Sequence, residues 1–290
     1  MVILALDANN LINRAFYAIP LMFARDKTPT NAIRGFCNTL LNLQEQTKAD
    51  LTIAAFDGGT PPFRKEAAPS YKANRGEKPP ELDEQLAICA ALVCPALGVP
   101  VIKHPGTEAD DILFTLALRA SEAQHSIWIA SGDKDTAQCL DLPETHLLRP
   151  PQKSTDPWAE TRKETAIEIF GVHPSQIPDY LAITGDSCDN LPGVPGAGPK
   201  TAAKWLAEYQ NIAGILQNKD KLTPRFQKAL DPELLRKNLL VTTAYDTGDK
   251  IPQPKNPPET QREFFNELGL HRIANRLTHS QAILRKSTAE

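Results

Sequence analysis

The chain has 290 residues, of which 41% are hydrophobic and 23% charged, so it is long enough to bury a large core and has the composition of an ordinary globular protein. It contains no apolar run of about 18 residues and no basic region followed by an apolar stretch at its start, which excludes a membrane span and a signal peptide. Its net charge of −3 lacks the basic excess that is typical of nucleic-acid-binding proteins, and its five cysteines without CxxC spacing favour reduced thiols in the cytoplasm over disulfides or a zinc site.

Along the chain, short apolar runs rich in Val and Ile alternate with helical patterns, and this alternation predicts a mainly parallel sheet flanked by helices. The predicted strands cover 2–7, 51–57, 99–103 and 126–133, and the helices between them cover about 31–47, 82–96 and 108–123. Helical patterns dominate afterwards, at about 161–170, 175–184, 200–208, 233–245 and 260–277. We therefore predict an α/β core in residues 1–180 and a helical region in residues 181–290.

Acidic residues follow several predicted strands. Asp7 and Asp57 end the first two strands, and Asp133 ends the fourth, with Asp135 two residues later. The carboxyl ends of parallel strands meet at one edge of a sheet, where ligands bind. The helix after the third strand opens with GTEADDIL, which adds Glu108, Asp110 and Asp111. Each acid alone also fits a turn or a helix start, and Thr107 with Asp110 fits a capping box.

Together these acids suggest a metal centre. Two further aspartates precede a glycine-rich turn, and the complete set has nine members: Asp7, Asp57, Glu108, Asp110, Asp111, Asp133, Asp135, Asp186 and Asp189. So many carboxylates in one crevice repel one another unless cations accompany them, and Mg²⁺ prefers such oxygen ligands. Two ions about 4 Å apart activate water and stabilise the leaving oxygen of a phosphodiester. Without these nine acids, Lys and Arg outnumber Asp and Glu in the rest of the chain.

Two other stretches have features of phosphate binding. Residues 63–86 interleave basic side chains with Phe63 and Tyr71, which suits phosphate contact and base stacking but also a solvated loop. The stretch LPGVPGAGPKTAAKWL fits a hairpin between two helices, whose exposed N–H groups would bind phosphate together with Lys200 and Thr201. A tight helix connection is the alternative, and the stretch does not match the Walker A pattern.

The ordered motifs resemble the 5′-nuclease family, which includes the 5′→3′ exonuclease domain of bacterial DNA polymerase I and the flap endonucleases. The matching stretches run almost from end to end: LDANNLINRAF, PTNAIRGF, FDGGTPPFRKE, SYKANR, GTEADDIL, SGDKDTAQCL, ITGDSCDNLPGVPGAGPKTA and LRKNLLVT. The sequence departs from many members at Ala8, where glycine is common, and at Cys188, where serine is common.

This resemblance implies a helical arch at about 63–96 above the active site and a helix-hairpin-helix motif in the helical region. It implies that the nine acids bind two divalent ions, Mg²⁺ or Mn²⁺, with K⁺ at the hairpin. Asp110, Asp133, Lys72 and Arg75 are then the catalytic residues, and Lys72 and Arg75 neutralise the scissile phosphate. The implied DNA-binding residues are Arg14, Tyr71, Lys72, Arg75, Gly193, Gly196, Gly198, Lys200 and Thr201.

The implied activity is structure-specific 5′→3′ exonuclease and flap endonuclease cleavage of DNA in primer removal, replication and repair. We expect a cytoplasmic monomer that acts on double-stranded DNA with a 5′ flap or 5′ end, including RNA-primed ends, and that does not bind membranes. Two alternatives remain: a PIN-type ribonuclease, which shares strand-end carboxylates but is usually shorter, and a non-catalytic branched-DNA-binding protein, which would have lost some of the acids.

Overall fold

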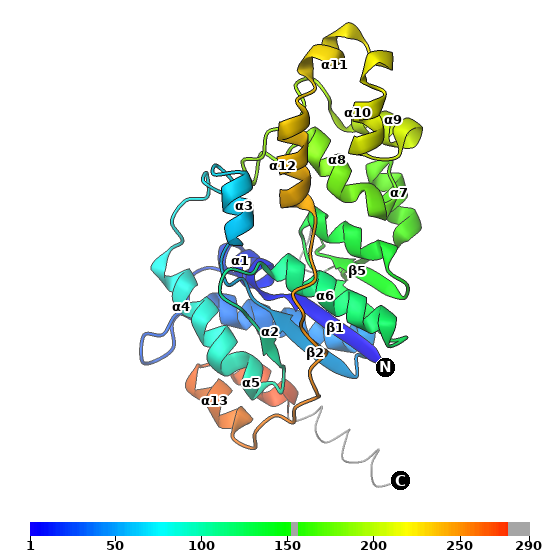
Figure 1. Cartoon of the computed structure of the whole chain (residues 1–290). Helices are drawn as coiled ribbons and strands as arrows, with labels where there is room; N and C mark the ends of the chain where they lie inside the picture. The colour runs from blue at the N-terminus through cyan, green and yellow to red at the C-terminus, as the bar shows by residue number, and fades with distance from the viewer. Residues whose placement is uncertain (152–155, 278–290) are drawn as a thin grey trace.

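A computed structural model of the protein describes residues 1–151 and 156–277, and its centre is a six-stranded sheet in the order β3-β2-β1-β4-β5-β6 (Figure 1). The strands are β1 (Val2–Asp7), β2 (Leu51–Ala55), β3 (Val101–Ile102), β4 (Ser126–Ala130), β5 (Thr145–Arg149) and β6 (Ala159–Thr161). The first five are parallel, and β6 pairs antiparallel with β5. The prediction of a mainly parallel sheet is therefore confirmed.

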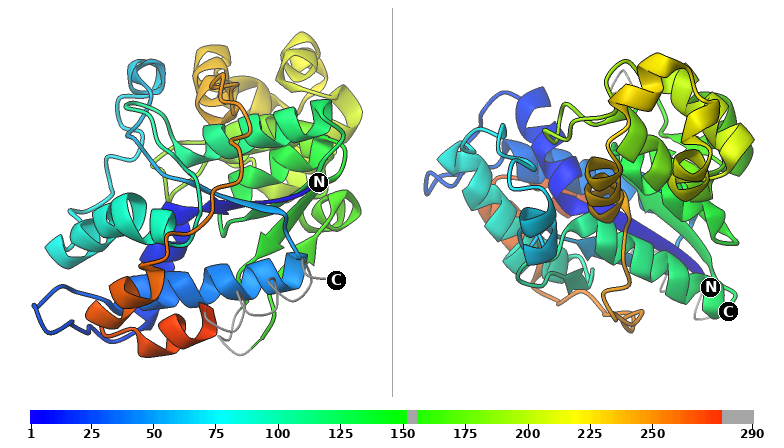
Figure 2. Two further views of the ribbon diagram at one scale, coloured as in Figure 1. Left: turned by 90° about the horizontal axis from the view of Figure 1, so that it is seen from below. Right: turned by 45° about the horizontal axis from the view of Figure 1, so that its top comes forward.

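The sheet separates two hydrophobic cores. Alternate residues of β1 face opposite sides, so Ile3 and Ala5 pack into one core and Leu4 and Leu6 into the other. The core around Leu4 is covered by α1 (Ala8–Ala18), α2 (Asn31–Thr47), α4 (Pro80–Ile88), a π-helical turn (Cys89–Val93), α5 (Cys94–Ala96) and α13 (Gln261–Glu267). The core around Ile3 is covered by α6 (Ala109–Glu122) and the helical region, and Figure 2 shows α2 and α6 on opposite faces of the sheet.

A run of helices that begins before the predicted boundary at residue 181 continues the core of the α6 face. It contains α7 (Lys163–Phe170), a 3-10 turn (Pro174–Gln176), α8 (Ile177–Thr184), α9 (Pro199–Tyr209), α10 (Ile212–Gln217), a second 3-10 turn (Lys219–Lys221), α11 (Pro224–Ala229) and α12 (Pro232–Thr242). After α12 the chain runs back along α6 and then reaches α13 (Figure 1). Along α6, the Thr247 N–H donates to the Thr115 hydroxyl at 2.8 Å. No helix among the described residues is long and apolar enough to cross a membrane.

Several boundaries differ from the prediction. The elements α1, β5, β6, α10 and α11 were not predicted, and the short helix α3 (Pro62–Ala67) lies at the start of the predicted arch. The helix expected from 161 begins at Lys163, because β6 occupies the preceding residues. The helix expected over 260–277 is interrupted at Gly269, whose φ of 70° breaks helical geometry, and it resumes over 271–277. Residues 278–290 of the predicted helical region lie outside the described part of the chain.

Candidate metal centre and nucleic-acid interface

The ends of β1 and β4 form the floor of the candidate site. These strands are neighbours, and the chain connections leave in opposite directions on either side of them, which creates the crevice typical of open parallel sheets. Asp7 caps α1 by accepting from the Asn10 N–H at 3.0 Å, and its other oxygen accepts from the Ser131 hydroxyl at 2.7 Å. The Gly132 N–H donates to the Asn10 side chain at 3.1 Å. The first carboxylate is thereby fixed beside the turn that contains Asp133.

Four of the predicted acids line an open cavity of about 430 Å³ at this edge: Asp7, Asp57, Asp110 and Asp133. The Asp57 carboxylate accepts from the Ala109 N–H at 2.8 Å, so the amino terminus of α6 fixes its position. Lys72, Arg75 and the exposed ring of Tyr17 line the same cavity. An acidic floor therefore has a basic and aromatic rim.

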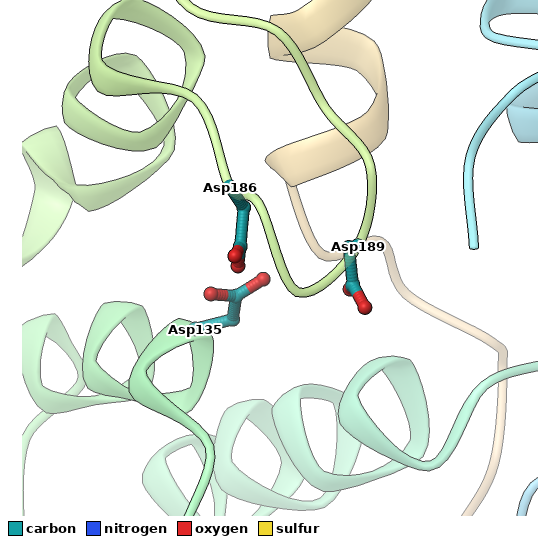
Figure 3. A group of neighbouring side chains, drawn as sticks. All are labelled: Asp135, Asp186 and Asp189. Atoms are coloured by element: carbon teal, nitrogen blue, oxygen red, sulfur yellow. The ribbon is translucent and has the colours of Figure 1, made fainter. Parts of the chain in front are cut away.

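A second acidic group lies beside the first. Asp135 is in a 3-10 helix (Lys134–Asp141) after β4, whereas Asp186 and Asp189 are on the loop that follows α8. One carboxylate oxygen from each residue lies within 4.8 Å of the others, and Asp135 and Asp186 point toward each other in Figure 3. Reciprocal backbone hydrogen bonds of 2.8 Å between Asp186 and Leu191 shape this loop. The group has the all-oxygen donor set that hard divalent cations prefer.

The electrostatics of both groups fit bound cations. Burial, followed by the nearby Asp57 and Asp133 charges, raises the pKa of Asp7 to about 7. Burial and neighbouring aspartates also raise the pKa values of Asp110 and Asp135 well above the ordinary range. In each of these two residues, Oδ1 is buried without a hydrogen-bond partner in the described part of the chain. A buried unpartnered oxygen is costly, and a metal ion would satisfy it.

Glu108 and Asp111 face a third, basic environment around Arg64, which is 3% exposed. Arg64 donates to Glu108 at 2.6 Å and to both carboxylate oxygens of Asp111 at 2.7 Å. Lys72 also donates to Glu108 at 2.6 Å, and the Tyr71 hydroxyl donates to it at 3.2 Å. Burial raises the pKa of Glu108, but Lys72 and Arg64 outweigh burial and hold that pKa below its usual range. The Asp111 carboxylate thus forms an ion pair with Arg64 and does not line the open cavity.

The proposed capping box at this helix is not formed. Glu108 is the N-cap residue of α6, and its side chain makes no capping hydrogen bond. Because the helix begins at Ala109, Thr107 lies one position before the N-cap, so the capping interpretation of Thr107 and Asp110 is wrong.

The basic segment after α3 is tied to the second acidic group. Arg75 donates to Asp189 at 2.6 Å, and the Lys72 backbone N–H donates to the Asp189 carbonyl at 2.8 Å. Two amide side chains add cross-links, from Asn74 to the Ser187 carbonyl and from Asn190 to the Ser70 carbonyl. Residues 70–75 are therefore anchored at the carboxylates and do not form a free solvated loop.

The glycine-rich loop between α8 and α9 exposes one side to solvent. Val194 and Ala197 are buried, whereas Gly196, Gly198 and Lys200 are exposed and Thr201 is half-buried. Gly198 is the N-cap residue of α9, Pro199 has no N–H, and the Thr201 N–H donates to the Gly198 carbonyl at 3.0 Å. The backbone N–H that the first turn offers to an anion is therefore that of Lys200.

Two other predicted DNA contacts have visible structural partners. Gly193 packs against the Thr184 backbone so closely that a Cβ would lie 2.4 Å from it. Arg14 is exposed on α1, and its guanidinium donates to the Pro151 carbonyl.

Three cations near the carboxylates were absent from the predicted site. Lys134 pairs with Asp186 at 3.0 Å. Its position between Asp133 and Asp135 in the sequence is a signal that could have identified it. Arg149 on β5 donates to the Ser131 and Asp133 carbonyls, and no sequence pattern marks it. Arg64 lies in the basic stretch 63–86, and it pairs with Glu108 and Asp111.

Comparison with known proteins gives consistent matches along the chain. Residues 2–171 match the family described as 5′-3′ exonuclease, N-terminal resolvase-like domain, and residues 172–245 match 5′-3′ exonuclease, C-terminal SAM fold. A 5′-3′ exonuclease from Aquifex aeolicus is 34% identical over 229 residues, which cover 79% of this chain and 77% of that protein. DNA polymerase I from Mycobacterium bovis is 35% identical over 276 residues, which cover 93% of this chain but 30% of the polymerase. The chain thus spans less than a third of the length of that relative.

Two solved structures share the fold. The T5 D15 protein co-crystallized with metal ions has a TM-score of 0.68 and 23% identity, with 97% of this chain and 98% of that chain covered. The catalytic core of Rad2 in complex with DNA substrate has a TM-score of 0.61 and 18% identity, with 94% and 89% covered.

Proposed function

Because the chain belongs to the 5′-3′ exonuclease family, we propose that it hydrolyses DNA phosphodiester bonds near 5′ ends, both as a 5′→3′ exonuclease and as a flap endonuclease. The observation that carries this proposal is the pair of neighbouring carboxylate groups, in which Asp110 and Asp135 each have a buried oxygen that no described residue hydrogen-bonds. An acidic site with this donor set, beside basic side chains that suit phosphate, fits metal-assisted phosphodiester cleavage.

The proposed cofactors are two divalent ions, Mg²⁺ or Mn²⁺. One would be held by the cavity-lining group of Asp7, Asp57, Asp110 and Asp133, and the other by the group of Asp135, Asp186 and Asp189. Glu108 would bind at the edge of these groups, while Asp111 would support the site through Arg64. When bound, such ions activate water and offset negative charge on phosphate oxygens.

The protein's own cations have the complementary task. Lys72 and Arg75 line the cavity together with Asp110 and Asp133, and they would orient the scissile phosphate and neutralise its charge. Tyr71 would lie at the base of the arch against the nucleotide that enters the site. Most of the rate acceleration would then come from positioning and charge stabilisation.

The duplex would be held at a distance from the chemistry. Gly196, Gly198, Lys200 and Thr201 would bind its backbone through the start of α9, with Gly193 shaping the loop and K⁺ bound there. Arg14 would contact phosphate on the other side of the cavity. In this arrangement residues 1–180, together with Asp186 and Asp189, perform the chemistry, and the rest of the 181–290 region holds a 5′-flap, 5′-ended or RNA-primed duplex, with the protein acting as a monomer.

A labelled 5′-flap duplex tests the proposal directly. The intact chain is incubated with Mg²⁺, with Mn²⁺ or with EDTA, beside Asp186→Asn and the control Asp141→Asn, which changes an exposed acid outside both groups. We expect metal-dependent cuts at the flap junction that Asp186→Asn abolishes and Asp141→Asn retains, with DNA binding intact in both.

Two results would favour the other functions. Binding of the flap without cleavage under either metal would indicate a branched-DNA-binding protein. Preferential cleavage of a single-stranded RNA would instead indicate a PIN-type ribonuclease.

A further inference from the structure

Lys134 occupies an unusual position within the second acidic group. Its neighbours in sequence are Asp133 and Asp135, yet its side chain turns to the loop after α8 and pairs with Asp186, with 3.0 Å between Nζ and Oδ2. The Lys134 side chain is 43% exposed, whereas that of Asp186 is 11% exposed. The ion pair therefore joins a carboxylate inside the group to a cation at its rim.

The other carboxylates of this group differ in their charge partners. Asp189 pairs with Arg75 at 2.6 Å and has Lys72 at 4.0 Å, whereas Asp135 has a buried oxygen with no hydrogen-bond partner in residues 1–151 and 156–277. Lys134 is the only cation paired with Asp186 among the described residues. Without Lys134, Asp186 would face Asp135 with no opposite charge in contact with it (Figure 3).

We propose that Lys134 is a built-in counter-cation, which holds Asp186 in place in the metal-free protein and competes with a divalent ion for the group of Asp135, Asp186 and Asp189. This inference rests on the proposed metal-dependent function. Lys134 Nζ pairs with Oδ2 of Asp186, while Oδ1 accepts from the Cys188 N–H at 2.9 Å. A divalent ion bound to this carboxylate would lie close to the ammonium group, and the two positive charges would repel. The flexible and half-exposed lysine stem allows the ammonium to leave without a change in the backbone.

Removal of the lysine charge should therefore strengthen metal binding. We expect Lys134→Gln to tighten Mn²⁺ binding at one site of the full chain by about three- to tenfold, as the loss of a partly exposed charge interaction predicts. Lys134→Arg keeps the charge and should stay close to the unchanged protein. Lys237→Gln is the matched control, because Lys237 is similarly exposed and pairs with Glu233 at 2.7 Å on α12, outside both acidic groups.

Electron paramagnetic resonance of free Mn²⁺, recorded without DNA, measures the affinity independently of turnover. A double-variant cycle tests whether Lys134 acts on Mn²⁺ binding through Asp186. In the Asp186→Asn protein, the further change Lys134→Gln should leave the Mn²⁺ affinity unaltered. Circular dichroism confirms that each variant is folded.

Unchanged or weaker Mn²⁺ binding by Lys134→Gln would overturn the inference. If the unchanged protein still cut the flap duplex in that case, the proposed function would stand without it. Failure of the unchanged protein to bind Mn²⁺ at all would overturn both.

Discussion

Replacement of Arg64 by methionine tests whether the buried ion pairs beside the acidic cavity stabilise the fold. Arg64 donates to Glu108, to both oxygens of Asp111 and to the Thr243 carbonyl. Glu108 keeps Lys72 and Tyr71 as partners in Arg64→Met, but Asp111 is fully buried and loses its only cationic partner among the described residues. Leaving a buried charge unpaired costs about 3–5 kcal/mol, and we expect the free energy of unfolding to fall by that amount.

The cost should depend on pH in a defined direction. Burial raises the pKa of Asp111, and Arg64 opposes that rise. Without Arg64 the pKa of Asp111 moves further above its unfolded value, so the folded state binds an additional proton as pH falls. The stability lost by Arg64→Met should therefore be largest at alkaline pH and shrink toward acidic pH.

Urea unfolding of the metal-free protein at pH 8 and pH 5 measures both effects. Arg119→Met is the control, because Arg119 pairs with Glu122 and Asp246 at the surface, and its loss should have a much smaller effect. The double variant Arg64→Met/Asp111→Leu removes both charges and should regain most of the lost stability. A loss below about 1 kcal/mol for Arg64→Met at pH 8 would refute this account of the ion pair.

Three further changes test the loop and the acidic cavity. Gly196→Ala should lower the free energy of unfolding by about 1 kcal/mol and weaken duplex binding in fluorescence anisotropy, because Gly196 has a φ of 81° and the new Cβ would lie 2.2 Å from the Arg225 guanidinium. Gly248→Ala is the control: Gly248 has the same φ but no neighbouring atoms within 4 Å, so DNA affinity should not change. Lys200→Ala should weaken binding to all duplex sequences and lower the salt slope by about one, whereas an unchanged slope in a KCl titration would remove Lys200 from the phosphate contacts. In EDTA, the stability contributed by protonated Asp7 is fully present below its unfolded pKa of 3.8 and is lost as pH rises through its folded pKa of about 7. Thermal melts of the unchanged protein should therefore show a melting temperature that falls over this pH range, and melts of Asp7→Asn should not. Equal falls in both proteins would contradict the raised pKa of Asp7.

The sheet was predictable because its central strands are buried apolar runs with an aspartate at the strand end or shortly after it: β1 ends at Asp7, whereas β2 ends at Ala55, before Asp57, and β4 ends at Ala130, before Asp133. The run VILALD of β1 is buried from Ile3 to Asp7, and such a run leaves little doubt about its place in the sheet. The edge strands lack this signal: β6 has three residues, AET, of which two are exposed. Its existence depends on pairing with β5, which local sequence does not encode.

The acidic cavity was predictable for the same topological reason, but the separation of Asp110 from Asp111 was not. Successive residues on a helix point about 100° apart, and here Asp110 lines the cavity while Asp111 pairs with Arg64. Which of them turns inward depends on α3, which brings Arg64 to Asp111 from a distant part of the sequence. Arg149 reaches the Asp133 turn from β5 in the same way, through a strand that the sequence analysis did not predict.

The cations around the carboxylates link metal binding to DNA binding under the proposed function. Lys72 pairs with Glu108, Arg75 with Asp189 and Lys134 with Asp186, so in the metal-free protein each of these side chains already has an anionic partner. If a divalent ion were held by the same carboxylates, those pairs would be weaker, and the ammonium and guanidinium groups would be available to phosphate. Because coupling between two sites is reciprocal, DNA that attracts these cations must in turn raise the affinity of the carboxylates for metal. The hydrogen bond from the Lys72 N–H to the Asp189 carbonyl would keep the two sets of charges together while their side chains exchanged partners.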